Sequence, residues 1–136
     1  MANEEQVELI IKYKHYFEKL LENSKAPAVI DETNVYQEAN PVPRQILFDV
    51  INENLCEGSR LEGKENFKAF YDAVKAGKRG LILMEHYTNL DLPAILCMLN
   101  NEGSEWAKDL SSRIVAIAGM KLNEEHPIVR AWTEGF

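Results

Sequence analysis

His86 and Asp91 are residues of the types that move protons, and the stretch HYTNLD places them five positions apart. A carboxylate that holds one imidazole N–H fixes the tautomer of the ring and leaves the other nitrogen free as a base. Side chains five positions apart do not stack on one helix face. Across a strand, a turn and a helix start, however, the backbone folds back and the carboxylate can reach the ring. Such a pair would take the proton from an alcohol as that alcohol attacks a substrate.

Apolar runs on either side of this pair predict the elements that position it. The run RGLILME (79–85) is short, continuous and ends just before His86, which is typical of a buried strand. The segment NLDLPAILCMLNN (89–101) has the length of a helix, and RIVAIAG (113–119) predicts a second buried strand. Together they predict a βαβ unit with a parallel sheet and a right-handed crossover. His86 would then lie at the carboxyl end of a strand, where open α/β sheets bind ligands.

The first part of the chain predicts helices rather than strands. Apolar residues recur at helical spacing in three segments, 7–23, 44–58 and 65–77. The predicted fold class is therefore α/β. An N-terminal helical region with a linker (1–60) precedes the first part of an α/β domain with a partly parallel sheet (61–136). Because two strands do not form a stable parallel sheet by themselves, we expect the chain to be the front part of a longer protein.

The composition is that of an ordinary globular chain, with 46% hydrophobic and 27% charged residues. The net charge of −7 argues against a general nucleic-acid binder, which needs a basic surface. Cys56 and Cys97 have no metal-ligand spacing around them, so we expect buried, reduced thiols and no metal site. The sequence contains neither a phosphate-binding P-loop motif nor a G-x-S-x-G nucleophile elbow. Its acidic start and the lack of a long apolar run predict an intracellular protein that does not cross a membrane.

A resemblance to a known family rests on the residues around His86. The motif HYTNLD resembles the H-x4-D motif of the glycerolipid acyltransferases, and the approach to it from Leu61 to Pro93 is similar to that of the family. The segment IVAIAGMKLNEEHPIVRAW (114–132) resembles the next block of the soluble, chloroplast-type glycerol-3-phosphate acyltransferases. In that subgroup a helical region precedes the α/β catalytic part.

The resemblance implies a reaction and roles for four residues. His86 would be the general base on the hydroxyl of glycerol 3-phosphate, and Asp91 would orient it. The hydroxyl would attack the thioester of acyl-CoA or an acyl-carrier protein, with no cofactor and no covalent enzyme intermediate. Lys121 and Arg130 would bind the substrate, with Arg130 near the phosphate of the acceptor. The expected location is the cytoplasm, with peripheral contact at the inner face of a membrane.

Two alternatives stay open at the level of the sequence. The acceptor could be 1-acylglycerol 3-phosphate, or the chain could be a non-catalytic helical interaction module in which Asp91 only caps a helix. The orientation of the carboxylate distinguishes the roles, because a cap faces backbone N–H groups and a catalytic pair faces the ring. The other histidines carry weaker signals: His15 lies in the first predicted helix, and His126 precedes a proline in an expected extended loop.

Overall fold

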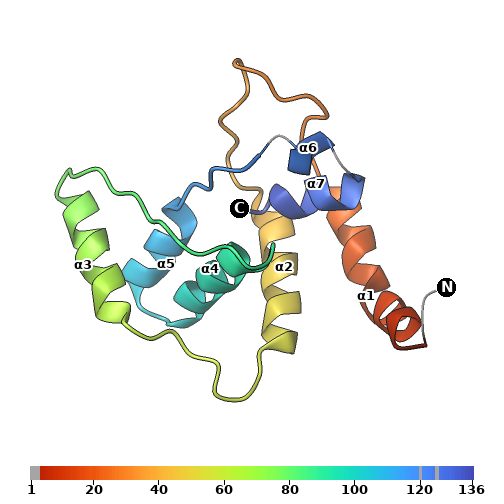
Figure 1. Ribbon diagram of the computed structural model, residues 1–136, viewed down its shortest axis with the longest axis horizontal. Helices are drawn as coiled ribbons and strands as arrows, with labels where there is room; N and C mark the ends of the chain where they lie inside the picture. The colour runs from red at the N-terminus through yellow and green to blue at the C-terminus, as the bar shows by residue number, and fades with distance from the viewer. Residues whose placement is uncertain (1–3, 120, 125) are drawn as a thin grey trace. The chain divides into compact units, whose positions relative to one another are not determined.

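The computed structural model describes residues 4–119, 121–124 and 126–136, and its regular elements are helices (Figure 1). They are α1 (Glu4–Asn23), α2 (Pro41–Asn54), α3 (Lys64–Lys75), α4 (Asp91–Asn101), α5 (Glu105–Arg113), α6 (Lys121–Glu124) and α7 (Pro127–Thr133). The chain divides into two compact units. The first contains Met1–Val50 and Ala116–Phe136, and the second contains Ile51–Val115.

The predicted α/β fold with a parallel sheet is wrong. No strand occurs in the described ranges, and the two segments predicted as buried strands, 79–85 and 113–119, are largely exposed. Leu83 leaves 84% of its surface open to solvent, and Ile117 leaves 95%. A strand is stable only when neighbouring strands pair with its backbone, and among the described residues neither run has such a neighbour.

The helical predictions are confirmed more closely. The helix predicted over 65–77 is α3, and the helix predicted over 89–101 is α4. Glycine ends α3 as expected, because Gly77 has a φ of 91°, which lies in the region that favours glycine. The extended loop predicted after His126 is wrong. Pro127 instead begins α7, and His126 caps this helix because its Nδ1 accepts a hydrogen bond from the N–H of Ile128 at 3.2 Å.

The first unit has its own core, formed where α1, α2 and α7 contribute apolar residues. Its buried members are Leu20, Ile46, Leu47 and Ala131, and Trp132 packs against them. A polar contact ties the end of this unit to its loops. The carboxylate of Glu134 accepts hydrogen bonds from the hydroxyl of Ser24 at 2.8 Å and from the side-chain amide of Asn40 at 2.9 Å.

The second unit carries the start of α4 and therefore the residues of the predicted pair. Its core comprises Leu99, Ala107 and Leu110, with partly buried aromatic residues of α3 and α5 packed around them. The hydroxyl of Ser111 on α5 donates to the carbonyl of Leu96 on α4 at 2.8 Å. This packing fixes α4, and α4 in turn fixes the position of its first residue, Asp91.

Two further predictions concerned the burial of the cysteines and the lack of a membrane-spanning segment. Cys97 is buried in α4, as expected, but the prediction for Cys56 is wrong because this residue is exposed. Cys56 follows the last turn of α2, where the chain turns at Gly58 and apolar neighbours end. Among the described helices, none combines the length and the apolar character needed to span a bilayer.

Candidate functional site

Asp91 is the first residue of α4, and its carboxylate faces back toward the loop that precedes the helix. The backbone N–H groups of Tyr87 and Thr88 donate to Oδ2 of Asp91 at 2.6 and 2.8 Å. The hydroxyl of Thr88 donates to Oδ1 at 3.0 Å. These donors come before Asp91 in the chain, so the carboxylate closes the loop instead of capping the free N–H groups of α4.

His86 lies at the other end of this loop, against the same carboxylate. Its Nδ1 is 3.3 Å from Oδ2 of Asp91, a contact that becomes an ion pair when the ring is protonated. The side chain of His86 is 72% exposed, whereas that of Asp91 is 19% exposed. The ring is therefore largely open to solvent, and Nδ1 is the nitrogen that lies beside the carboxylate.

The environment of Asp91 favours its charged form. The pKa of Asp91 is lowered, chiefly because the backbone N–H of Thr88 donates to the carboxylate. Partial burial acts in the opposite direction, and the N–H of Tyr87, the hydroxyl of Thr88 and, least of all, the charge of His86 add to the lowering. At neutral pH the carboxylate is ionised, and its Oδ2 lies within ion-pair distance of Nδ1 of His86.

This geometry can perform one chemical task without further groups. In a neutral histidine whose Nδ1–H faces an ionised carboxylate, Nε2 is the unprotonated nitrogen and can act as a base. Because the side chain of His86 is largely exposed, a substrate hydroxyl can approach its ring. The structure thus brings together the two residues that the sequence proposed as a proton-transferring pair.

The two residues predicted to bind the substrate, Lys121 and Arg130, are placed elsewhere in the chain. Arg130 lies on α7 and belongs to the first unit, whereas His86 and Asp91 belong to the second. Lys121 begins α6, but its side chain lies outside the described residues. Their role in substrate binding stays a prediction.

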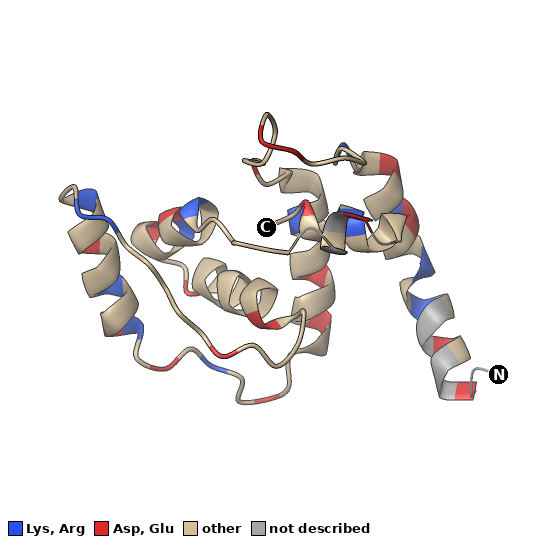
Figure 2. Ribbon diagram, turned by 45° about the horizontal axis from the view of Figure 1, so that its top comes forward, with Lys and Arg blue, Asp and Glu red and all other residues tan. Residues whose placement is uncertain are grey.

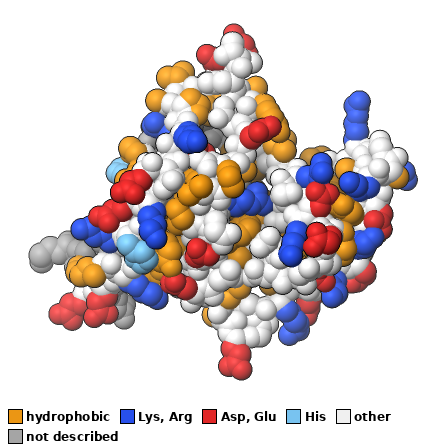
Figure 3. Space-filling model, turned by 180° about the vertical axis from the view of Figure 1, so that it is seen from behind, with side chains coloured by type: hydrophobic (Ala, Val, Ile, Leu, Met, Phe, Trp, Pro, Cys, Tyr) orange, Lys and Arg blue, Asp and Glu red, His pale blue; other side chains and the backbone are white. Residues whose placement is uncertain are grey.

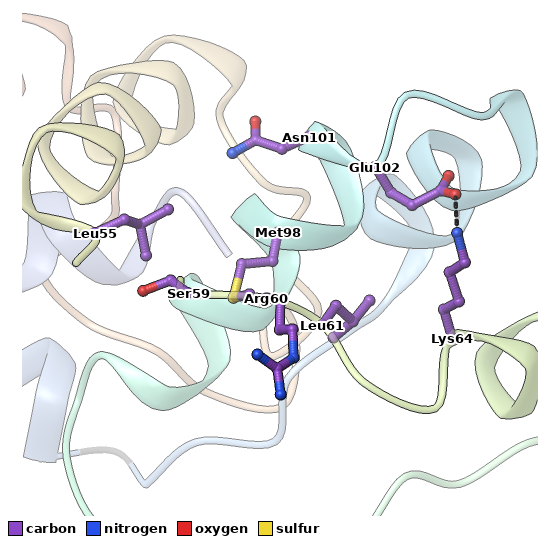
Figure 4. Close-up of a pocket in the computed structure, with 8 residues that line it drawn as sticks. All are labelled: Leu55, Ser59, Arg60, Leu61, Lys64, Met98, Asn101 and Glu102. Atoms are coloured by element: carbon purple, nitrogen blue, oxygen red, sulfur yellow. Dashed lines mark hydrogen bonds and ion pairs between the residues drawn. The ribbon is translucent and has the colours of Figure 1, made fainter. Parts of the chain in front are cut away.

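An open pocket of about 270 Å³ occurs in the second unit (Figure 4). Leu55, Met98 and Leu61 form its apolar lining, and Met98 lies between the two leucines in the view. Its cations are already paired: Nζ of Lys64 lies 3.4 Å from Glu102, and Nε of Arg60 donates to Glu62 at 2.8 Å. Both basic residues of the lining thus have an acidic partner, in ion pairs that are exposed to solvent.

Thr88 is the site residue that the sequence reasoning missed. It donates to Asp91 through both its backbone and its hydroxyl, and the hydroxyl also accepts from the N–H of Leu90 at 3.1 Å. A threonine three positions before an aspartate was the available signal, since Thr and Asp side chains commonly bond to nearby backbone groups in turns.

The chain was compared with protein-family models, curated proteins and solved structures. No protein-family model, no curated protein and no solved structure matches the chain.

Proposed function

We propose that the chain is an O-acyltransferase of the glycerol-3-phosphate type. In this reaction Nε2 of His86 removes the proton from an acceptor hydroxyl, and Asp91 orients the ring. The hydroxyl oxygen attacks the thioester carbonyl of acyl-CoA or an acyl-carrier protein, and the thiol of the donor leaves. Glycerol 3-phosphate is the preferred acceptor, with its 1-acyl derivative as the alternative.

The observation that carries this proposal is the 3.3 Å contact between Nδ1 of His86 and Oδ2 of Asp91. The contact involves one ring nitrogen of a largely exposed side chain, which leaves the second nitrogen for the role of general base. The choice of reaction rests on the resemblance of HYTNLD to the acyltransferase motif. The lack of a nucleophile elbow in the sequence also favours activation of a substrate hydroxyl over a serine nucleophile.

A second candidate function has an observation of its own. Three hydrogen bonds from Tyr87 and Thr88 hold the carboxylate of Asp91 in the loop, independently of the histidine. These bonds would serve equally in a non-catalytic interaction module, where Asp91 only orders the turn before α4. The two functions differ in what His86 contributes, because the module does not need its ring.

The test is transfer of a labelled acyl group to glycerol 3-phosphate by the 136-residue chain, with acyl-CoA and acyl-carrier protein as separate donors. We expect transfer by the wild type and a loss of at least about 100-fold in His86→Ala, the usual contribution of a general base. Asp91→Asn should also lose activity, since the amide orients the ring less well.

The matched control is His126→Ala, which removes a histidine that only caps α7. This variant should retain the wild-type rate. A folded wild type that transfers no acyl group from either donor to glycerol 3-phosphate or to its 1-acyl derivative would overturn the proposal. Equal rates in the wild type and His86→Ala would do so as well, and would favour the interaction module.

A further inference from the structure

Residues 79–86 form an extended apolar stretch whose backbone groups are unpaired within the described part of the chain (Figure 1). Residues 79–86 follow α3 without helical or turn structure, and their backbone N–H and C=O groups make no hydrogen bond to the described part of the chain. Unpaired backbone groups along an extended apolar segment are a template for strand pairing with another chain.

All side chains of this segment are exposed, but one face is more exposed than the other. Exposure alternates along the chain, at 71% for Leu81, 39% for Ile82, 84% for Leu83 and 40% for Met84. Gly80 lies on the less exposed face, so close to the Phe70 ring of α3 that a side chain there would collide with it. A period of two is that of a β-strand, so the exposure pattern of Leu81 to Met84 suits a strand that would pair through its free backbone groups.

The charges at the two ends of the segment indicate which partner would pair with it. Arg79 begins the segment and Glu85 ends it, and both lie equally far from Ile82. Figure 2 shows the basic residues that follow α3 at the start of this segment. When two copies pair antiparallel about Ile82, Arg79 of each copy lies opposite Glu85 of the other, and Leu81 lies opposite Leu83. The pairing is thus symmetric, as a closed dimer requires.

We propose that residues 79–85 form an antiparallel two-stranded ribbon with a second copy of this chain. Opposite charges then meet at both ends, and leucines meet between them, on the same face of the ribbon. Parallel pairing in register would place Arg79 beside Arg79 and Glu85 beside Glu85, which is unfavourable. Glu85 keeps one carboxylate oxygen for the second copy, because the hydroxyl of Tyr87 donates only to the other.

The test is the monomer–dimer equilibrium of the 136-residue chain, measured by sedimentation equilibrium. We expect a concentration-dependent dimer that Arg79→Glu and Glu85→Arg each weaken by about tenfold, since each creates two like-charge pairs. The double reversal R79E/E85R restores opposite charges and should return the dissociation constant to within about threefold of the wild type. Arg60→Glu is the matched control, because it changes an exposed charge of the same unit outside the ribbon.

A second measurement tests the register of the ribbon. In a Cys56→Ser background, Ile82→Cys should form a disulfide-linked dimer on mild oxidation, because Ile82 lies opposite itself at the symmetry axis. Met84→Cys should cross-link poorly, since its counterpart lies four positions away along the ribbon. A chain that sediments as a monomer at all concentrations, or a dimer that both charge reversals leave unchanged, would overturn the proposal. Equal cross-linking of the two cysteine variants would overturn the register.

Discussion

At the scale of single residues, the carboxylate of Asp91 contacts the ring of His86 and also closes the loop between them. From the sequence we expected the carboxylate to face either backbone N–H groups or the ring of His86. In the structure the same carboxylate does both. Oδ2 of Asp91 accepts from Tyr87 and Thr88 and still lies 3.3 Å from Nδ1 of His86. The spacing of the pair predicted that the carboxylate could reach the ring. It could not predict the loop bonds, which depend on the backbone direction at Thr88.

The lowered pKa of Asp91 makes the loop sensitive to acid. Protonation of a carboxylate with a depressed folded-state pKa removes stability that is present above the unfolded pKa of about 3.9. We therefore expect the loop 86–90 to keep its order at neutral pH and to lose it as pH falls below 3.9 through the pKa of Asp91. Carboxyl ¹³C shifts in an NMR titration measure this pKa directly. A midpoint above 3.9 would contradict the hydrogen-bonded geometry.

At the scale of elements, the sequence predicted the helices α3 and α4 correctly, but the two strands that it predicted do not occur in the described residues. The segment that forms α3 has apolar residues at helical spacing, and the segment that forms α4 is apolar over the length of a helix. A helix forms its backbone hydrogen bonds within itself, so it needs no partner segment. The run 79–85 is apolar enough for a buried strand, but a strand needs neighbours that the run itself does not specify. The hydrophobicity of this segment therefore indicated that it could form a strand. It is exposed because no partner strand occurs among the described residues.

The packing of α4 on α5 predicts a large effect of one substitution. Leu99 is fully buried, so Leu99→Ala should lower the free energy of unfolding of the second unit by about 2–5 kcal/mol. Trp106 packs against the same core and reports it by fluorescence when Trp132 is replaced by phenylalanine. Leu90→Ala is the control, because Leu90 is exposed and should change stability by less than about 0.5 kcal/mol. Equal effects of the two substitutions would contradict the described core.

At the scale of the whole molecule, the described chain has two separate apolar cores and a surface of mixed charge. The apolar clusters around Leu47 and around Leu99 draw their buried members from different units. On the face seen in Figure 3, acidic and basic side chains are interspersed and do not gather by sign. The net charge of −7 was readable from the sequence, but the division into units was not, because it depends on contacts between distant segments. His86 and Asp91 both belong to the second unit, so the catalytic proposal depends on an arrangement within that unit alone.

The most direct test of that arrangement is the tautomer of His86, read from the ¹⁵N chemical shifts of its ring at a pH where the ring is neutral. The described contact predicts that Nδ1 carries the proton, because it faces the ionised carboxylate of Asp91. Asp91→Ala should reduce the population of this tautomer, while His126 should be unchanged. A wild-type ring with its proton on Nε2 would contradict the account, because the nitrogen exposed to a substrate could then not act as the base.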